Sequence, residues 1–114
     1  MTESQLQQNC IQWFRFQYPK YGRLLFAVPN GHKRNIVTAV KLKKEGVVAG
    51  VSDLILLVPN KTYHGLCIEM KMGKGKQTEL QKEFQSDVEQ MGYKYYVCRT
   101  LEEFINLINN YIYE

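Results

Sequence analysis

The chain lacks any long hydrophobic run. Its apolar stretches, of which residues 54–58 are among the longest, are far shorter than the roughly 20 residues that a helix needs to cross a bilayer. The first residues, Met1 to Gln5, show neither a basic start nor an apolar core, so no signal peptide is predicted. We therefore expect no membrane segment and a cytoplasmic location.

Cysteine and histidine are also scarce. Cys10, Cys67 and Cys98 cannot all pair within one chain, and none of them forms a C-x-x-C motif. Each lies in an apolar stretch, which favours small buried side chains in a reducing compartment. With only His32 and His64 beside them, a cysteine and histidine zinc site is not expected.

The composition is that of an ordinary folded protein. Hydrophobic residues make up 45% and charged residues 23% of the 114 residues, which excludes intrinsic disorder. A chain of this length has room for one hydrophobic core. The sequence shows no repeats and no linker, so we expect one domain over residues 1–114.

Positive charge is concentrated in the first two thirds of the chain. Residues 1–76 carry twelve Lys and Arg against four Asp and Glu, whereas residues 77–114 carry three against seven. The segment 32–44 has five basic residues and no acidic one. Such clusters suit a polyanion such as nucleic acid, although a solvated charged face is the alternative for any single run. A second basic group follows at Lys71, Lys74 and Lys76.

Apolar spacing and turn signals predict alternating helices and strands. The capping box formed by Thr78 and Gln81, for example, marks the start of one helix. Two strands joined by a short turn predict a hairpin. The order α-β-α-β-β-α-β-α indicates an α/β fold, a small mixed sheet with helices on both faces. The predicted elements are helix 3–18, strand 23–28, helix 33–45, strands 53–58 and 65–71, helix 78–91, strand 94–99 and a helix from Thr100 to about residue 112.

Three charged residues stand at the ends of two predicted strands. Glu69 and Lys71 share a face because residues two apart in a strand project together, and hairpin pairing can bring Asp53 beside them. Two neighbouring carboxylates repel unless a cation neutralises them, and Mg²⁺ prefers oxygen ligands. The Lys71 ammonium can then hold an activated water or the charge that develops on a phosphate. An ion pair at a strand end is the competing interpretation.

The order and spacing of several motifs resemble the VRR-NUC family, a branch of the PD-(D/E)xK nuclease superfamily. The resemblance extends from Glu3 to about Arg99, and it implies a restriction-endonuclease-like sheet flanked by helices. The motifs are Glu3 and Gln7, Asn30-Gly31, Gly46-x-x-x-Gly50-x-x-Asp53-Leu54, Gly65-Leu66-x-Ile68-Glu69-x-Lys71, Gly75-Lys76 and Gln81.

The resemblance also implies roles for individual residues. Asp53 and Glu69 match the metal ligands of the family, and the backbone carbonyl of Met70 matches a third ligand. Lys71 matches the catalytic lysine, and Glu3 matches a helical glutamate that completes the site through water.

Further residues are implied around this centre. Gln81 matches a glutamine near the active site on the following helix. The sequence departs from the family at Ser52, where proline is usual, and at Val97-Cys98-Arg99, which stands for Val-Arg-Arg. Serine is acceptable there because proline shapes the backbone and supplies no ligand. The residues expected to contact DNA are Asn30, Lys33, Arg34, Lys74, Lys76 and Arg99.

Together these features predict a DNA endonuclease that depends on Mg²⁺ or Mn²⁺. The resemblance implies 5′-phosphate products, and small stand-alone members, often carried by phages, look like homodimers that act on branched DNA such as Holliday junctions. The apolar faces of helix 3–18 and of the last helix are candidate dimer surfaces, with the protein core as the alternative. A non-catalytic nucleic-acid-binding module and a structural subunit are the competing functions.

Overall fold

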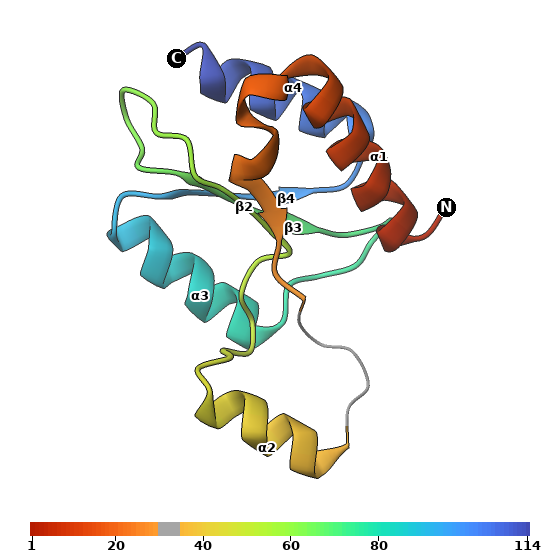
Figure 1. Cartoon of the computed structure of the whole chain (residues 1–114), viewed down its shortest axis with the longest axis vertical. Coiled ribbons are helices and arrows are strands. Elements are labelled where there is room, and N and C mark those ends of the chain that lie inside the picture. The colour runs from red at the N-terminus through yellow and green to blue at the C-terminus, as the bar shows by residue number, and fades with distance from the viewer. Residues whose placement is uncertain (30–34) are drawn as a thin grey trace.

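A mixed four-stranded sheet lies at the centre of the molecule (Figure 1). The computed structural model describes residues 1–29 and 35–114, and it confirms the predicted order of helices and strands. A short 3-10 helix, η1, was not predicted. The elements are α1 (Glu3–Gln17), η1 (Pro19–Leu24), β1 (Leu25–Ala27), α2 (Ile36–Lys44), β2 (Leu54–Leu56), β3 (Leu66–Met70), α3 (Glu79–Gln90), β4 (Lys94–Cys98) and α4 (Leu101–Ile112).

The strands are ordered β1-β2-β3-β4 across the sheet. β2 pairs with both β1 and β3 in antiparallel fashion, so the predicted hairpin of β2 and β3 is confirmed. β3 and β4 are parallel, and α3 forms the crossover between them. In this register Leu54 lies opposite Ile68, which places Asp53 near the end of β3.

Helices cover the two faces of the sheet unequally. α1 and α4 pack against each other and against one face, whereas α3 packs on the other face against β4 (Figure 1). All five residues of β3 are buried, because this central strand has a neighbour on each side and helices on both faces. The largest fully buried side chains include Phe14, Phe104, Leu54, Ile68 and Met70.

The apolar faces of α1 and α4 form the core. Phe14, Phe104 and Ile108 are fully buried, and Trp13 meets the Phe104 ring edge-on at 6.0 Å. Of the two uses predicted for these faces, the core is the one that the structure shows. Phe16 is the exception, since 87% of its surface is exposed.

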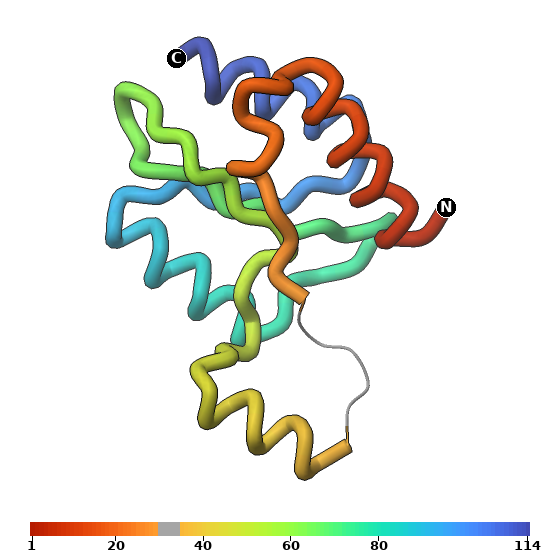
Figure 2. Tube along the Cα trace, in the orientation of Figure 1, coloured from red at the N-terminus to blue at the C-terminus, as the bar shows by residue number. Residues whose placement is uncertain are grey.

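None of the side chains of α2 is buried, and within residues 36–44 only Leu42 is partly buried. Its predicted apolar side is exposed to solvent, with 82% of Ile36 and 79% of Val37 accessible. Figures 1 and 2 show α2 set apart from the sheet and its covering helices. The helix begins at Ile36, and the side chain of its N-cap, Asn35, accepts a hydrogen bond from the Thr38 backbone N–H.

All three cysteines are buried and form no disulfide, as the sequence indicates. Burial raises the pKa of Cys10 to about 12 and that of Cys98 to about 11, so neither thiol is reactive at neutral pH. Among the helices of residues 1–29 and 35–114, none is long and apolar enough to cross a membrane.

Candidate active site

The Asp53 carboxylate lies beside the end of β3. Its Oδ2 accepts a hydrogen bond of 2.7 Å from the backbone N–H of Met70. The pairing of β2 and β3 ends at Leu54 and Ile68. Beyond that end, the Asp53 side chain, and not a further backbone carbonyl of β2, accepts the Met70 N–H. This bond fixes the carboxylate at the edge where both strands end. The preceding Ser52 is buried and donates its hydroxyl to the carbonyl of Leu54.

Glu69 is a buried carboxylate in the middle of the site. It projects from the face of β3 that carries α3, and only 3% of its surface is exposed. Its Oε2 accepts a hydrogen bond of 3.0 Å from the Gln81 side chain. Its Oε1 is buried and has no hydrogen-bond partner among the described residues.

Lys71 lies next to Glu69, as the alternation of side chains along a strand predicts. The Lys71 Nζ is 3.6 Å from Glu69 Oε2, and the lysine side chain is only 13% exposed. Its backbone N–H bonds the carbonyl of Cys98, which extends the pairing of β3 and β4 by one residue. The ammonium is therefore held close to the carboxylate by the end of the sheet.

Gln81 joins the start of α3 to this site. Its side-chain oxygen accepts from the Thr78 backbone N–H at 2.9 Å, and its backbone N–H donates to the Thr78 hydroxyl. This confirms the predicted capping box. The amide nitrogen of the same side chain holds Glu69, so one residue caps the helix and orients the carboxylate.

The electrostatics of the site favour a proton or a cation on Glu69. Burial and the nearby Asp53 carboxylate together raise the pKa of Glu69 to about 8, although Lys71 opposes the rise. A buried carboxylate oxygen without a partner costs free energy. Asp53 and Glu69 therefore fit a divalent cation with oxygen ligands.

Glu3 is not brought into this cluster. It lies exposed in the first turn of α1. Within residues 1–29 and 35–114, no three acidic, histidine or cysteine side chains come together as a metal-binding group. The described protein side chains thus supply two carboxylates, Asp53 and Glu69.

The loop after β3 carries two exposed lysines beside the site. Lys74 and Lys76 are exposed, while the Arg99 guanidinium donates a hydrogen bond of 2.9 Å to the Gly73 carbonyl. The backbone N–H of Arg99 donates to the Glu103 carboxylate. Arg99 thus ties this loop to the end of β4. Asn30, Gly31, Lys33 and Arg34 lie outside the described residues.

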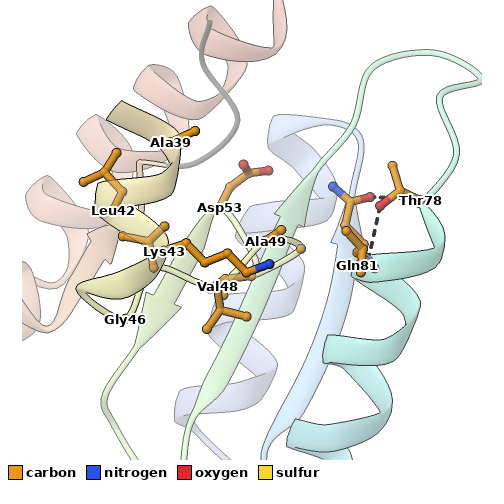
Figure 3. A pocket seen from close by; sticks show the side chains of 13 residues that line it. Ala39, Leu42, Lys43, Gly46, Val48, Ala49, Asp53, Thr78 and Gln81 are labelled. Carbon is orange, nitrogen blue, oxygen red and sulfur yellow. Dashed lines mark hydrogen bonds between the residues drawn. The ribbon is translucent and has the colours of Figure 1, made fainter. Parts of the chain in front are cut away.

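A groove of about 800 Å³ leads away from Asp53. It runs between α2, the connecting segment 46–51 and the first turn of α3, and Figure 3 shows the Lys43 side chain extending into it. Gly50 allows this close packing, because its φ is +90° and an added Cβ would lie 2.5 Å from the Leu80 carbonyl oxygen. Asp53 and Gln81 belong both to the groove and to the carboxylate site.

Sequence reasoning missed the groove and one buried phenol near the site. Tyr95 lies opposite Cys67 in the sheet, and burial, reinforced by Glu69 and Asp53, raises its pKa to about 12. The glycines at 46 and 50 were the signal for a close approach in this region. No sequence signal distinguishes Tyr95 from the neighbouring strand tyrosines.

Comparisons with known proteins agree with this geometry. The model of the VRR-NUC domain family matches residues 1–101. A solved structure described as a VRR_NUC domain protein aligns with a TM-score of 0.87 and 31% sequence identity, covering 99% of this chain and 89% of that one. A search of curated proteins found no match. The family, the sheet with its flanking helices and the paired carboxylates lead to one conclusion: this chain belongs to the VRR-NUC family of nucleases.

Proposed function

We propose that this protein is a metal-dependent endonuclease that hydrolyses phosphodiester bonds in branched DNA such as Holliday junctions. The observation that carries the proposal is the buried Glu69 carboxylate, which lies beside Asp53 and has one oxygen without a partner. A structural ion pair would satisfy that oxygen internally. A site that binds a cation leaves it available.

In this proposal each residue has a defined role. Asp53, Glu69 and the Met70 carbonyl would hold Mg²⁺ or Mn²⁺, and Glu3, which lies outside this cluster, would act on it only through intervening water. The bound ion would supply charge neutralisation at the phosphate and a more acidic bound water. Lys71 stabilises negative charge next to Glu69, and Gln81 keeps that carboxylate in place.

DNA contacts are assigned to the basic residues around the site. Lys74 and Lys76 are exposed on the loop after β3, where they would meet phosphates. Arg99, Asn30, Lys33 and Arg34 complete the proposed surface. A homodimer would present two sites to the symmetric strands of a junction. The exposed Phe16 is an uncovered apolar side chain on α1 that a second copy would bury.

The test is a cleavage assay with labelled four-way junction, flap and linear duplex DNA, each with Mg²⁺, Mn²⁺ or EDTA. We expect paired nicks in the junction that require the metal. Lys71→Ala should lower the rate at least about a hundredfold. Lys61→Ala, an exposed lysine in the hairpin turn, serves as the matched control and should keep the wild-type rate.

Each alternative has its own signature in this assay. Equal cleavage of all substrates would retain the nuclease and remove the preference for branched DNA. Binding that weakens with salt, without cleavage in any metal, would replace the proposal with a non-catalytic binding module. A monomeric mass in light scattering, with and without DNA, would remove the homodimer.

A further inference from the structure

The groove beside Asp53 has a largely aliphatic lining. Its walls are aliphatic and include Leu42 of α2, Val47 and Val48 of the connecting segment, and Leu80 of α3. About half of the surface of Val48 and Leu80 is exposed, at 59% and 51%. Its volume of about 800 Å³ lies in the range of pockets that hold organic ligands.

The groove is continuous with the catalytic carboxylates. Asp53 lies between α2 and α3 in Figure 3, and Gln81, which holds Glu69, lines the same groove. A DNA strand whose phosphate lies at the carboxylates therefore has its neighbouring nucleotide within reach of the aliphatic walls. Two lining residues shared with the site make this a single continuous surface.

Charge supports a nucleotide as the occupant. Lys43 extends into the groove, and Lys41 and Lys44 lie on the same helix. The ion pairs among the described residues join Lys71 to Glu69 and Lys82 to Glu79, so the three lysines of α2 are not neutralised by such a pair. A nucleotide has two parts that this groove suits. Its aliphatic walls can pack on the flat face of the base, and the ammonium groups of α2 can meet the phosphate.

We propose that this groove binds an unpaired nucleobase next to the phosphodiester that is cleaved. The inference rests on the proposed function in that the ligand is the DNA substrate. A base within an intact duplex is stacked and paired, so it reaches the groove only after unstacking, which costs free energy. A flap or a junction with unpaired nucleotides avoids that cost. The groove therefore supplies a physical reason for selecting branched DNA.

The test measures the affinity for DNA with Ca²⁺ in place of Mg²⁺, so that it does not depend on cleavage. The probes are a duplex with a short single-stranded flap and the same flap with abasic residues in place of its nucleotides. Wild-type protein should bind the abasic flap about tenfold more weakly. Val48→Asp should lose this difference, because the carboxylate makes the groove polar.

Val37→Asp is the matched control. Val37 is an exposed valine on α2, the helix that carries the three lysines, and it does not line the groove. Its substitution introduces the same charge, so any general repulsion of phosphates appears in both variants. We expect Val37→Asp to retain the full tenfold difference between the two flaps.

Three outcomes would overturn the inference. The first is equal binding of the two flaps by the wild type, and the second is a retained tenfold difference in Val48→Asp. The third is a dimer that Val48→Asp converts to a monomer in light scattering, because a second copy would then occupy the groove. The cleavage assay with Mg²⁺ or Mn²⁺ tests the proposed nuclease activity separately, because it does not depend on whether the groove binds a base.

Discussion

Glu69 combines two properties that rarely occur together in a protein interior. It is almost completely buried, and the carboxylate of Asp53 lies near it. Each property disfavours the charged form, and the 3.6 Å contact with Lys71 compensates only in part, since the pKa still rises to about 8. The metal-free protein should therefore carry a proton on Glu69 at neutral pH.

This proton makes the stability of the metal-free protein depend on pH. The pKa of Glu69 is about 8 in the folded state against an ordinary 4.5, so the folded protein retains a proton that the unfolded chain releases. The resulting stabilisation is complete below pH 4.5 and is lost as the pH rises to 8. Glu69→Gln should abolish this loss and so raise the free energy of unfolding at pH 8 relative to the wild type.

Thermal unfolding in EDTA between pH 5 and 9 measures the effect. Glu83→Gln, on the exposed side of α3, controls for the loss of one charge and should follow the wild-type profile. Parallel profiles of wild type and Glu69→Gln would show that Glu69 is ionised in the folded protein without a metal.

Gln81 offers a way to separate structure from chemistry at a single position. Gln81→Ala removes both the capping box and the bond to Glu69, and it should cost about 1 kcal/mol of stability together with activity. Gln81→Glu keeps an oxygen for the Thr78 N–H but places a carboxylate against Glu69.

For Gln81→Glu we therefore expect an intact start of α3 with a large loss of cleavage. Amide exchange at Gln81 and Lys82 measures the helix start, and junction cleavage measures the activity. If both variants cleaved at the wild-type rate, Gln81 would have no role beyond the cap.

At the scale of single residues, the sequence predicted neighbouring side chains correctly where a simple periodicity applies. Strand alternation predicts that Glu69 and Lys71 share a face, and the structure shows their contact. The bond between Asp53 and the Met70 N–H was beyond reach, because it depends on the residue at which β2 pairing stops. That end point is set by the register of the sheet and not by local composition.

Arg99 shows how one element positions another. Its guanidinium holds the Gly73 carbonyl and so joins the end of β4 to the loop that carries Lys74 and Lys76. The salt dependence of DNA affinity can distinguish the proposed contact of Arg99 with DNA from its structural bond to Gly73. A lysine that binds a phosphate changes the slope of log K against log salt, whereas a residue that only orders a loop does not.

Lys74→Ala should reduce that slope by about one. Arg99→Ala should reduce the slope as well, because Arg99 is proposed to contact DNA, and it should also speed amide exchange at Gly75, whose N–H donates to the Met72 carbonyl. The measurements are DNA affinity over a range of salt and exchange by NMR. An unchanged slope in Arg99→Ala would limit Arg99 to ordering the loop and remove it from the phosphate contacts.

The elements themselves were largely predictable, with instructive exceptions. Capping threonines and apolar spacing located α1, α3 and α4 to within a few residues. η1 was not predicted because a short 3-10 helix has no hydrophobic period of its own. The apolar side of α2 was predicted, but its exposure was not, since periodicity does not reveal whether a partner surface exists.

For the whole molecule, the arrangement of layers determines what each part contributes to stability. α1, α4 and the buried strands form a continuous core, whereas α2 buries none of its side chains. Replacing residues 36–44 with a Gly-Ser segment of equal length should lower Tm by less than about 4 °C, the shift that about 1 kcal/mol produces in a domain of this size.

Thermal unfolding of this variant provides the check. Retained cleavage of linear duplex DNA would show that the sheet and its carboxylates assemble without the helix. A fall in Tm of 10 °C or more would mean that α2 is held to the rest of the chain much more tightly than its exposure indicates.

The peripheral position of α2 has a consequence for how such a nuclease can change over evolution. In the proposed groove α2 takes part in recognising DNA from outside the core, so substitutions in it should alter substrate selection while leaving the carboxylates and the fold almost untouched. On this proposal, lineages would diversify their DNA targets by varying residues 36–44, and a designer would do the same by grafting a different helix onto an unaltered scaffold.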